Sequence, residues 1–183
     1  MSIINSILKA FVGDKSQKDI KLIQPLIAKT RTFENALGAL SHDQLRAKTT
    51  EFKTRISTAR ADKDQAIAAK KIEAENISDI DAREDIYNAI DALEKEAYEL
   101  SEKVLMEILP EAFAVVKETA RRFKENTTIT VSATPKDIEL SAVKPYITIE
   151  NNQSIWKNSW NAAGKEITWD MIHYDVQLIG GTV

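Results

Sequence analysis

Residues 86–108 read IYNAIDALEKEAYELSEKVLMEI, a stretch without glycine or proline in which apolar residues recur every three or four positions. The recurring residues are Ile86, Ile90, Leu93, Ala97, Leu100, Val104 and Ile108. Such a stripe of about three heptads predicts a long helix that packs against a second helix. Residues 76–79 break the pattern within the run 61–108, so we expect a helical hairpin whose arms meet between Glu75 and Ser78. Pairing within the chain is favoured over a zipper between two copies.

Charge is distributed unevenly along the chain. The 183 residues have a net charge of −3, but residues 1–60 carry +6 and residues 61–107 carry −8. Such a split marks either a basic arm for an anionic surface or two elements that neutralise each other, and the sequence leaves both open. The absence of cysteine excludes disulfides, thiolate metal sites and thiol catalysis. No stretch has the roughly 18 apolar residues that span a bilayer.

The N-terminal residues predict a short amphipathic helix. Ser2 can cap it and Gly13 can end it. Its apolar face would consist of Ile3, Ile4, Ile7, Leu8, Phe11 and Val12. From the residues alone, packing of this face on the chain's own core is favoured over a membrane surface or a partner groove.

Two further helices are expected before the hairpin. Residues 16–39 alternate lysine with apolar residues, and Pro25 would bend this helix or begin a new one. Ser41 and Gln44 have the spacing of a capping box, which opens the next helix. That helix places Leu45, Lys48, Thr49, Phe52 and Ile56 on one face.

After the hairpin the sequence predicts one more helix and then strands. Pro110 is a helix-start signal for a helix over residues 109–123. Its apolar face would consist of Phe113, Val116, Ala120 and Phe123, with Arg121 and Arg122 capping and solubilising its end. Residues 127–133 and 146–150 alternate in the manner of strands, and a turn at residues 151–152 leads to another. We expect a small antiparallel sheet with a core of Trp156, Trp160 and Trp169.

The closing stretch, WDMIHYDVQLIGGTV at residues 169–183, places a polar and aromatic lead-in before an apolar run and a glycine pair. Val176, Leu178 and Ile179 predict a strand or a helix that is about to be buried. Since no partner element follows, we expect the chain to be a piece cut from a longer protein.

The arrangements that usually carry catalysis are missing. His42 and His173 are far apart and lack metal-ligand spacing, and no Gly-x-x-x-x-Gly-Lys-[Ser/Thr] phosphate loop is present. The carboxylates of residues 61–107 are expected to form a solvated helix face, and the acidic balance disfavours nucleic-acid binding. We therefore predict no catalytic residue and no metal site.

Three stretches nevertheless resemble one family. They are ALSHDQLRAKTTEFKTR at residues 39–55, LPEAFAVVKETARR at residues 109–122 and MIHYDVQLIGG at residues 171–181. In this order they resemble three sequence motifs of SecA, the ATP-driven motor of bacterial preprotein export. The resemblance implies a predominantly α, α+β fold: long helices, an inserted helical hairpin, a small antiparallel β unit and the first elements of a RecA-like P-loop motor domain.

The resemblance also implies a division of the chain. Residues 1–60 would form amphipathic and basic helices, residues 109–123 a helix of the motor domain, and residues 171–183 the start of the nucleotide-binding domain. Residues 61–108 and 124–170 would be insertions into the common pattern, of the type found in Bacteroidetes members. The motifs do not indicate what these two insertions do.

By this resemblance the closing stretch is an adenine-recognising Q motif. Gln177 would hydrogen-bond the adenine edge, because an amide offers both a donor and an acceptor. Met171 and Tyr174 would supply apolar and stacking contacts. Ile172 stands where the family has arginine, which removes any contact made by that cation. ATP with Mg²⁺ would be the cofactor of the parent protein, a protein-secreting ATPase. The 183 residues end before a Walker A loop, and we expect them to bind no nucleotide tightly and to hydrolyse none.

The family's N-terminus contacts anionic lipid and the SecYEG channel. By this resemblance, residues 1–31 are expected to bind a membrane surface, and packing on the chain's own core becomes the less favoured alternative. The lipid- or channel-contacting residues would be Ile3, Ile4, Ile7, Leu8, Lys9 and Phe11. The implied partners are SecYEG, anionic phospholipid, preproteins and a second copy in a homodimer, without nucleic acid. The implied location is the cytoplasm and the cytoplasmic face of the inner membrane. The rival hypothesis is a non-enzymatic helical adaptor or interaction module that merely shares the N-terminal segment of SecA.

Overall fold

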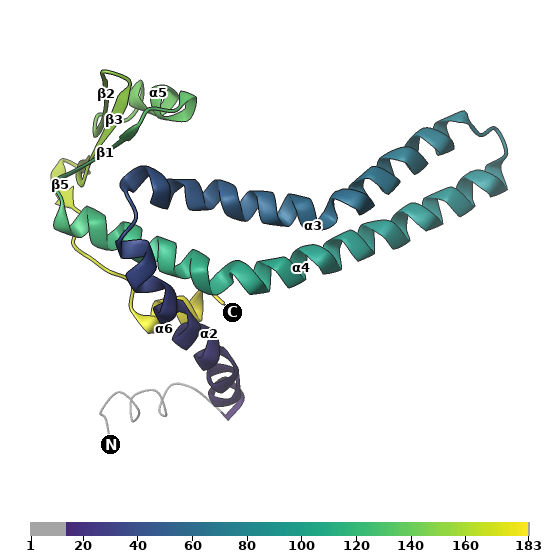
Figure 1. Cartoon of the computed structure of the whole chain (residues 1–183), viewed down its shortest axis with the longest axis horizontal. Helices are drawn as coiled ribbons and strands as arrows, with labels where there is room; N and C mark the ends of the chain where they lie inside the picture. The colour runs from purple at the N-terminus through teal and green to yellow at the C-terminus, as the bar shows by residue number, and fades with distance from the viewer. Residues whose placement is uncertain (1–13, 183) are drawn as a thin grey trace. The chain divides into compact units, whose positions relative to one another are not determined.

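The computed structural model describes residues 14–182 of the chain (Figure 1). Its elements are α2 (Asp14–Gly38), α3 (His42–Asn76), α4 (Ile80–Glu125), β1 (Thr128–Ser132), α5 (Pro135–Ser141), β2 (Ile147–Glu150), β3 (Gln153–Lys157), β4 (Ser159–Ala162), β5 (Lys165–Thr168) and α6 (Asp175–Gly180). The predicted class, predominantly α with small antiparallel sheets, is confirmed. The chain divides into two compact units, Ala47–Leu109 and the remainder on either side of it. None of the described helices is apolar over a length that would cross a bilayer.

The unit Ala47–Leu109 contains the helical hairpin that was predicted over residues 61–108. Its first arm, in α3, ends at Asn76 and its second arm, in α4, begins at Ile80 (Figure 1). The core between the arms consists of Ile67, Ala74, Ile86, Ile90 and Ala97, with Ile77 and Leu93 packed against it. The expected pairing within the chain is therefore confirmed, and most of the apolar stripe that predicted it is buried or half-buried.

Ion pairs and caps hold the arms and their connection. Lys71 pairs with Glu94 at 3.0 Å, and Lys63 pairs with Glu96. Asp79 accepts a hydrogen bond from the Ala82 N–H at 3.0 Å, which satisfies one of the free donors at the start of α4. The break at residues 76–79 is thus a connection with its own polar contacts.

The helix start predicted at Pro110 is wrong. Pro110 is buried inside α4, which continues without interruption from Ile80 to Glu125. A proline removes one backbone donor and crowds the preceding turn, and packing along a long helix outweighs this local cost. Pro25 is likewise inside α2, so the alternative in which it begins a new helix is wrong.

The second unit begins with α2 and the start of α3. The predicted capping box is confirmed, because the Ser41 N–H donates to Gln44 Oε1 at 2.8 Å and the Gln44 N–H donates to Ser41 Oγ at 3.2 Å. A small core of Leu37, Leu45 and Ala114, with Phe33, Leu40 and Val115 against it, joins these helices to α4.

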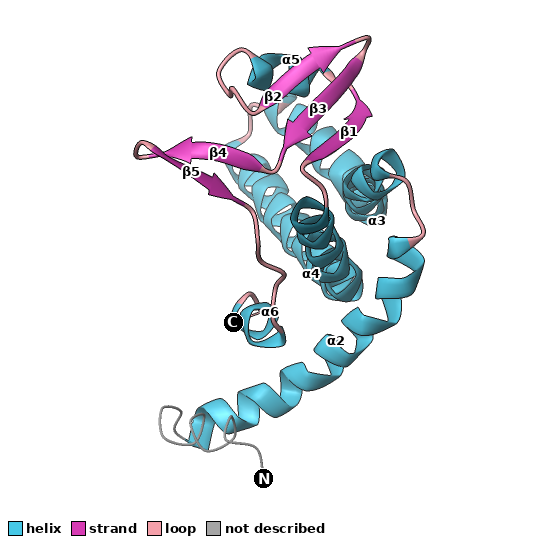
Figure 2. Cartoon of the chain, turned by 90° about the vertical axis from the view of Figure 1, so that its left-hand side faces the viewer, coloured by secondary structure: helices cyan, strands magenta, loops and turns pink. Residues whose placement is uncertain are grey.

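The three-stranded sheet has the order β1-β3-β2, and both pairs are antiparallel (Figure 2). Asn151 and Asn152 connect β2 to β3 with positive φ angles of 48° and 62°. Asparagine tolerates this left-handed backbone, which two-residue hairpin turns require. The expected turn is confirmed.

The expected tryptophan core is wrong in its residues. The buried residues of the sheet are Ile129, Val131, Ile147 and Ser154. Trp156 is only half-buried on β3, and Trp160 belongs to a separate two-stranded sheet of β4 and β5 that the sequence did not predict (Figure 2).

Candidate functional site

The closing stretch contains a short helix, α6, so the helical alternative is correct and the strand is not. Leu178 is buried and Ile179 half-buried, whereas Val176 is exposed. The Tyr174 N–H donates to Gln177 Oε1 at 2.8 Å, so the Gln177 side chain closes the first turn of the helix. This local bond explains why the segment forms a helix without a sheet beside it.

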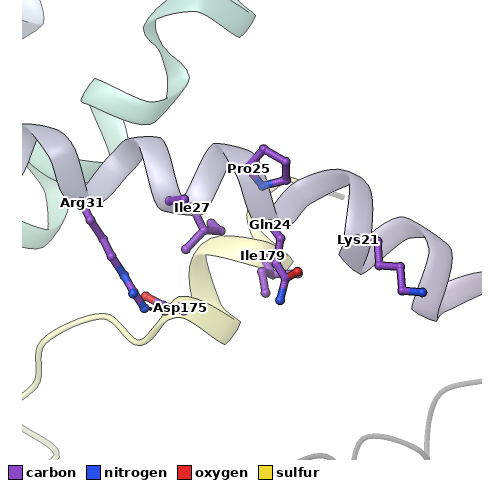
Figure 3. A pocket seen from close by; sticks show the side chains of 8 residues that line it. Lys21, Gln24, Pro25, Ile27, Arg31, Asp175 and Ile179 are labelled. Atoms are coloured by element: carbon purple, nitrogen blue, oxygen red, sulfur yellow. Dashed lines mark hydrogen bonds and ion pairs between the residues drawn. The ribbon is translucent and has the colours of Figure 1, made fainter.

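One face of α6 borders a pocket of about 510 Å³ (Figure 3). Its lining residues are Lys21, Gln24, Pro25, Ile27, Ala28 and Arg31 of α2, with Asp175 and Ile179 of α6. Arg31 and Asp175 form an ion pair between the two helices. The pocket therefore combines apolar walls with exposed cationic and amide groups.

The predicted adenine-contacting residues lie outside this pocket lining. Asp175 and Ile179 are four residues apart and share one face of α6, whereas Gln177 lies between them in sequence and on the opposite face. The side chains of Gln177 and Tyr174 are exposed. Met171 is half-buried, and its carbonyl accepts a hydrogen bond from Trp169 Nε1 at 2.8 Å. The structure thus joins Tyr174 to Gln177 through the cap, and the Met171 side chain takes no part in that bond.

A buried polar atom lies within the same stretch. His173 Nδ1 has no hydrogen-bond partner among the residues that the structure describes. Its ring is 6.4 Å from that of Trp169, centre to centre. Buried polar atoms are rarely left unpaired, so this nitrogen suits a water, a ligand or a further protein group.

The buried charges of this unit are centred on Arg122. Its guanidinium donates to the carbonyls of Leu37 and Leu40 at 3.0 and 2.8 Å, to Glu118 Oε1 at 2.7 Å, and to His42 Nδ1 at 3.1 Å. Leu37 lies in the last turn of α2 and Leu40 just beyond it, so Arg122 supplies donors where the helical hydrogen bonds end. The expected solubilising role is wrong for Arg122, which is buried; the partly exposed Arg121 pairs with Glu118 and Glu125.

Burial raises the pKa of the Glu118 carboxyl, but hydrogen bonds from Arg121 and Arg122 outweigh it and hold the pKa below its usual range. The apolar face predicted for this part of α4 is also incorrect at Val116, which is exposed. The buried face instead runs through Ala114, Glu118 and Arg122 at four-residue spacing. Apolar periodicity missed it because two of its three members are charged.

A second buried carboxylate, Asp137, joins the β unit to the start of α3. It accepts bonds from Arg46 Nη2 at 2.7 Å and from the Thr134 N–H and Oγ at 2.8 Å. Burial raises the pKa of Asp137, and the bonds from Arg46 and Thr134 outweigh this effect and lower it. The signal was present in the sequence, since Thr134, Pro135 and Asp137 have the spacing of a capping box with proline in the first turn.

The predicted lipid- or channel-contacting residues, Ile3, Ile4, Ile7, Leu8, Lys9 and Phe11, lie outside the described residues. No group of three or more His, Cys, Asp or Glu in residues 14–182 is placed to hold a metal ion. Within this part of the chain, the candidate site is therefore the α6 stretch with Met171, Tyr174 and Gln177.

Comparison with known proteins extends over nearly the whole chain. Residues 8–183 match the SecA DEAD-like domain family. The chain is 70% identical over 183 residues, all of its length, to the protein translocase subunit SecA of Flavobacterium psychrophilum. It is 56% identical to that of Christiangramia forsetii over 99% of its length, and 44% identical to that of Bacteroides fragilis over 98%.

These matches cover the hairpin and the β unit as well as the three motif stretches, because they span 180 residues or more. The chain spans 16% of the length of each of these relatives. No solved structure matches it significantly. From the family match and the identities together, the chain belongs to the SecA DEAD-like domain family.

Proposed function

We propose that this chain is the N-terminal part of a SecA-type translocase, which couples ATP binding and hydrolysis to the passage of unfolded preproteins through the SecYEG channel. The observation that carries the proposal is the family match over residues 8–183, together with relatives that are named protein translocase subunit SecA. In this proposal the protein is cytoplasmic and peripheral on the inner membrane. The 183 residues lack a Walker A loop and do not hydrolyse ATP by themselves.

Within the parent protein, Gln177 recognises the adenine of ATP, which binds with Mg²⁺, and Met171 and Tyr174 contact the base. The exposure of the Gln177 side chain supports this role. Its Oε1 accepts a bond from the Tyr174 N–H, and its amide nitrogen can donate to a ring nitrogen of the base. The exposed Tyr174 ring, adjacent to this amide, is suited to apolar contact with a base.

The amphipathic residues Ile3, Ile4, Ile7, Leu8, Lys9 and Phe11 contact anionic lipid and the channel. Their support is the sequence, with apolar residues at helical spacing beside six cations in residues 1–31. Sedimentation of the chain with vesicles tests this role. Binding to anionic but not zwitterionic vesicles is expected, and equal binding to both would count against it.

The nucleotide proposal is tested in a longer chain that continues past Val183 into the phosphate loop. Gln177→Ala should raise the KM for ATP about tenfold, which corresponds to one or two lost hydrogen bonds. Gln65→Ala, at an exposed position of the hairpin, is the matched control and should leave the KM unchanged. If the longer chain neither binds nor hydrolyses ATP, the motor hypothesis fails and the helical adaptor is favoured.

A further inference from the structure

The hairpin unit exposes several large apolar side chains on its second arm, and four of them share one side of the helix. Ile80, Tyr87, Tyr98 and Leu105 of α4 are 78%, 52%, 63% and 42% exposed. All four belong to the compact unit Ala47–Leu109. Scattered exposed apolar residues are normal in proteins, but an ordered row of them marks an interaction surface.

These four residues form one row, here called the α4 stripe. They follow one another at intervals of 7, 11 and 7 residues. At 100° per residue, these intervals place all four within about 20° of each other around the helix, over a length of about 37 Å. The residues that pack between the arms, Ile86, Ile90 and Ala97, lie on a different face. The stripe is therefore a second apolar face of α4 that the hairpin core does not use.

Carboxylates border the α4 stripe. Glu84, Asp91 and Glu102 lie within about 60° of it on one side. None of the three forms an ion pair within the described residues. Glu94, between the two tyrosines, is paired with Lys71 at 3.0 Å. The nearest cation along the stripe, Arg83, donates to the Ile77 carbonyl at the hairpin turn. Lys95 lies about 20° beyond Glu84 and Glu102 on the same side, so this border carries three carboxylates and one lysine and is acidic on balance.

We propose that the α4 stripe docks a basic amphipathic helix of a separate protein, about 25 residues long, which lies along α4 as a third helix of the hairpin. The apolar face of such a helix would cover the stripe, and its lysines or arginines would meet Glu84, Asp91 and Glu102. The two tyrosines suit this partner, because their rings bury large areas at low entropic cost and attract cations to their faces. A second copy of the stripe is disfavoured as the occupant, since its carboxylates would repel those of the first.

The test uses a labelled 25-residue peptide of lysine, leucine and alanine whose leucines have helical spacing. A scrambled peptide of the same composition is its control. Fluorescence anisotropy with the 183-residue chain, at about 150 mM salt to limit nonspecific attraction, should show saturable binding of the helical peptide and binding at least tenfold weaker for the scrambled one. Absence of binding, or equal binding of the two peptides, overturns the proposal.

Two double variants locate the binding. Tyr87→Ser with Tyr98→Ser removes the centre of the stripe, and Asp91→Lys with Glu102→Lys reverses its border. Each should weaken binding at least tenfold while the helical circular dichroism is retained. The matched controls are Ile72→Ser with Met106→Ser, and Asp85→Lys with Glu99→Lys, which alter exposed residues of the same kinds away from the stripe. The controls should stay within twofold of the unaltered chain; an equal loss in them overturns the proposal.

The same measurement on a full-length translocase that carries the hairpin decides between occupants. Binding of the helical peptide to this protein is expected. If only the 183-residue chain binds it, the remainder of the translocase covers the stripe. If sedimentation shows a dimer of the chain that Tyr87→Ser with Tyr98→Ser dissociates, the occupant is a second copy. Either result overturns the proposal, and neither depends on whether the protein hydrolyses ATP.

Discussion

The guanidinium of Arg46 donates to Asp137 Oδ1 at 2.7 Å, so that the start of α3 holds the only acidic side chain of the described residues that is buried completely. The same guanidinium reaches the Ser132 carbonyl at 3.3 Å and Thr134 Oγ at 3.2 Å. Asp43, on the preceding turn, accepts from the Ser132 N–H at 2.9 Å. The attachment of the β unit to α3 is therefore polar.

Removal of this guanidinium should loosen the β unit. Arg46→Met leaves the buried Asp137 carboxylate with only its Thr134 donors, and we expect the free energy of unfolding to fall by about 1–3 kcal/mol. Urea unfolding followed by tryptophan fluorescence measures it, since Trp156 lies on β3. Lys136→Met, which breaks the exposed pair with Glu139, is the control and should cost about 0.5 kcal/mol or less. Equal effects of the two substitutions would contradict the structural role.

The stability of this unit should fall at acid pH. The pKa values of Asp137 and Glu118 are lowered in the folded chain by their hydrogen bonds to arginine and threonine, despite burial. Carboxyls with depressed folded pKa values stabilise the fold above their unfolded pKa of about 4, and this stabilisation is lost as the pH falls through the folded value. The Tm, followed by tryptophan fluorescence, should change little between about pH 7 and 5 and fall below about pH 4. Asp137→Asn should flatten the acid limb, whereas the exposed Glu139→Gln should not.

Arg122 should be the most sensitive polar position of the unit. Arg122→Met removes the donor to two carbonyls and leaves Glu118 buried with fewer partners, so we expect a loss of about 3–5 kcal/mol. Arg122→Lys should not restore the stability, because an ammonium cannot reproduce the planar fork of donors. Arg121→Met, at the neighbouring and more exposed position, should cost about 1 kcal/mol or less. Chemical denaturation of the three variants checks the order.

The hairpin should depend on its apolar core. Ile90 is buried between the arms, and Ile90→Ala should cost about 2–5 kcal/mol through lost burial and the cavity that remains. Ile72→Ala, at an exposed position of α3, is the matched control and should change the stability by less than about 0.5 kcal/mol. Thermal unfolding followed by helical circular dichroism measures both. A control as damaging as Ile90→Ala would show that the arms do not pair through this core.

Apolar periodicity predicted the parts of the fold that apolar residues hold together. The apolar residues that recur every three or four positions from Ile86 to Ile108 were sufficient to predict the hairpin. Two adjacent asparagines were sufficient to predict the β2–β3 turn. The same periodicity failed where charges are buried. Glu118 and Arg122 occupy the inner face of α4, so a pattern that counts only apolar residues placed Val116 there instead.

The resemblance of residues 171–181 to a family motif predicted the candidate site. It did not predict the local structure of that site, which is set by hydrogen bonding. Gln177 closes the first turn of α6 through the Tyr174 N–H, a capping role that the family resemblance does not indicate. The pocket between α2 and α6 requires Arg31 and Asp175 to meet across 144 positions of sequence. Such a long-range pair leaves no periodic signal in either segment, so the sequence gives no means to expect it.

The paired asparagines also set an order of assembly for the three-stranded sheet. Only Asn151 and Asn152 separate β2 from β3, so the loop that must close to pair these strands is very short. By contrast, β1 is separated from β3 by residues 133–152, so its pairing with β3 closes a much longer segment. Loop closure becomes less favourable with length, so the local hairpin should form first and serve as the template on which β1 pairs. The turn thereby acts as the kinetic starting point of the sheet, and a substitution there that disfavours positive φ should slow folding more than it speeds unfolding.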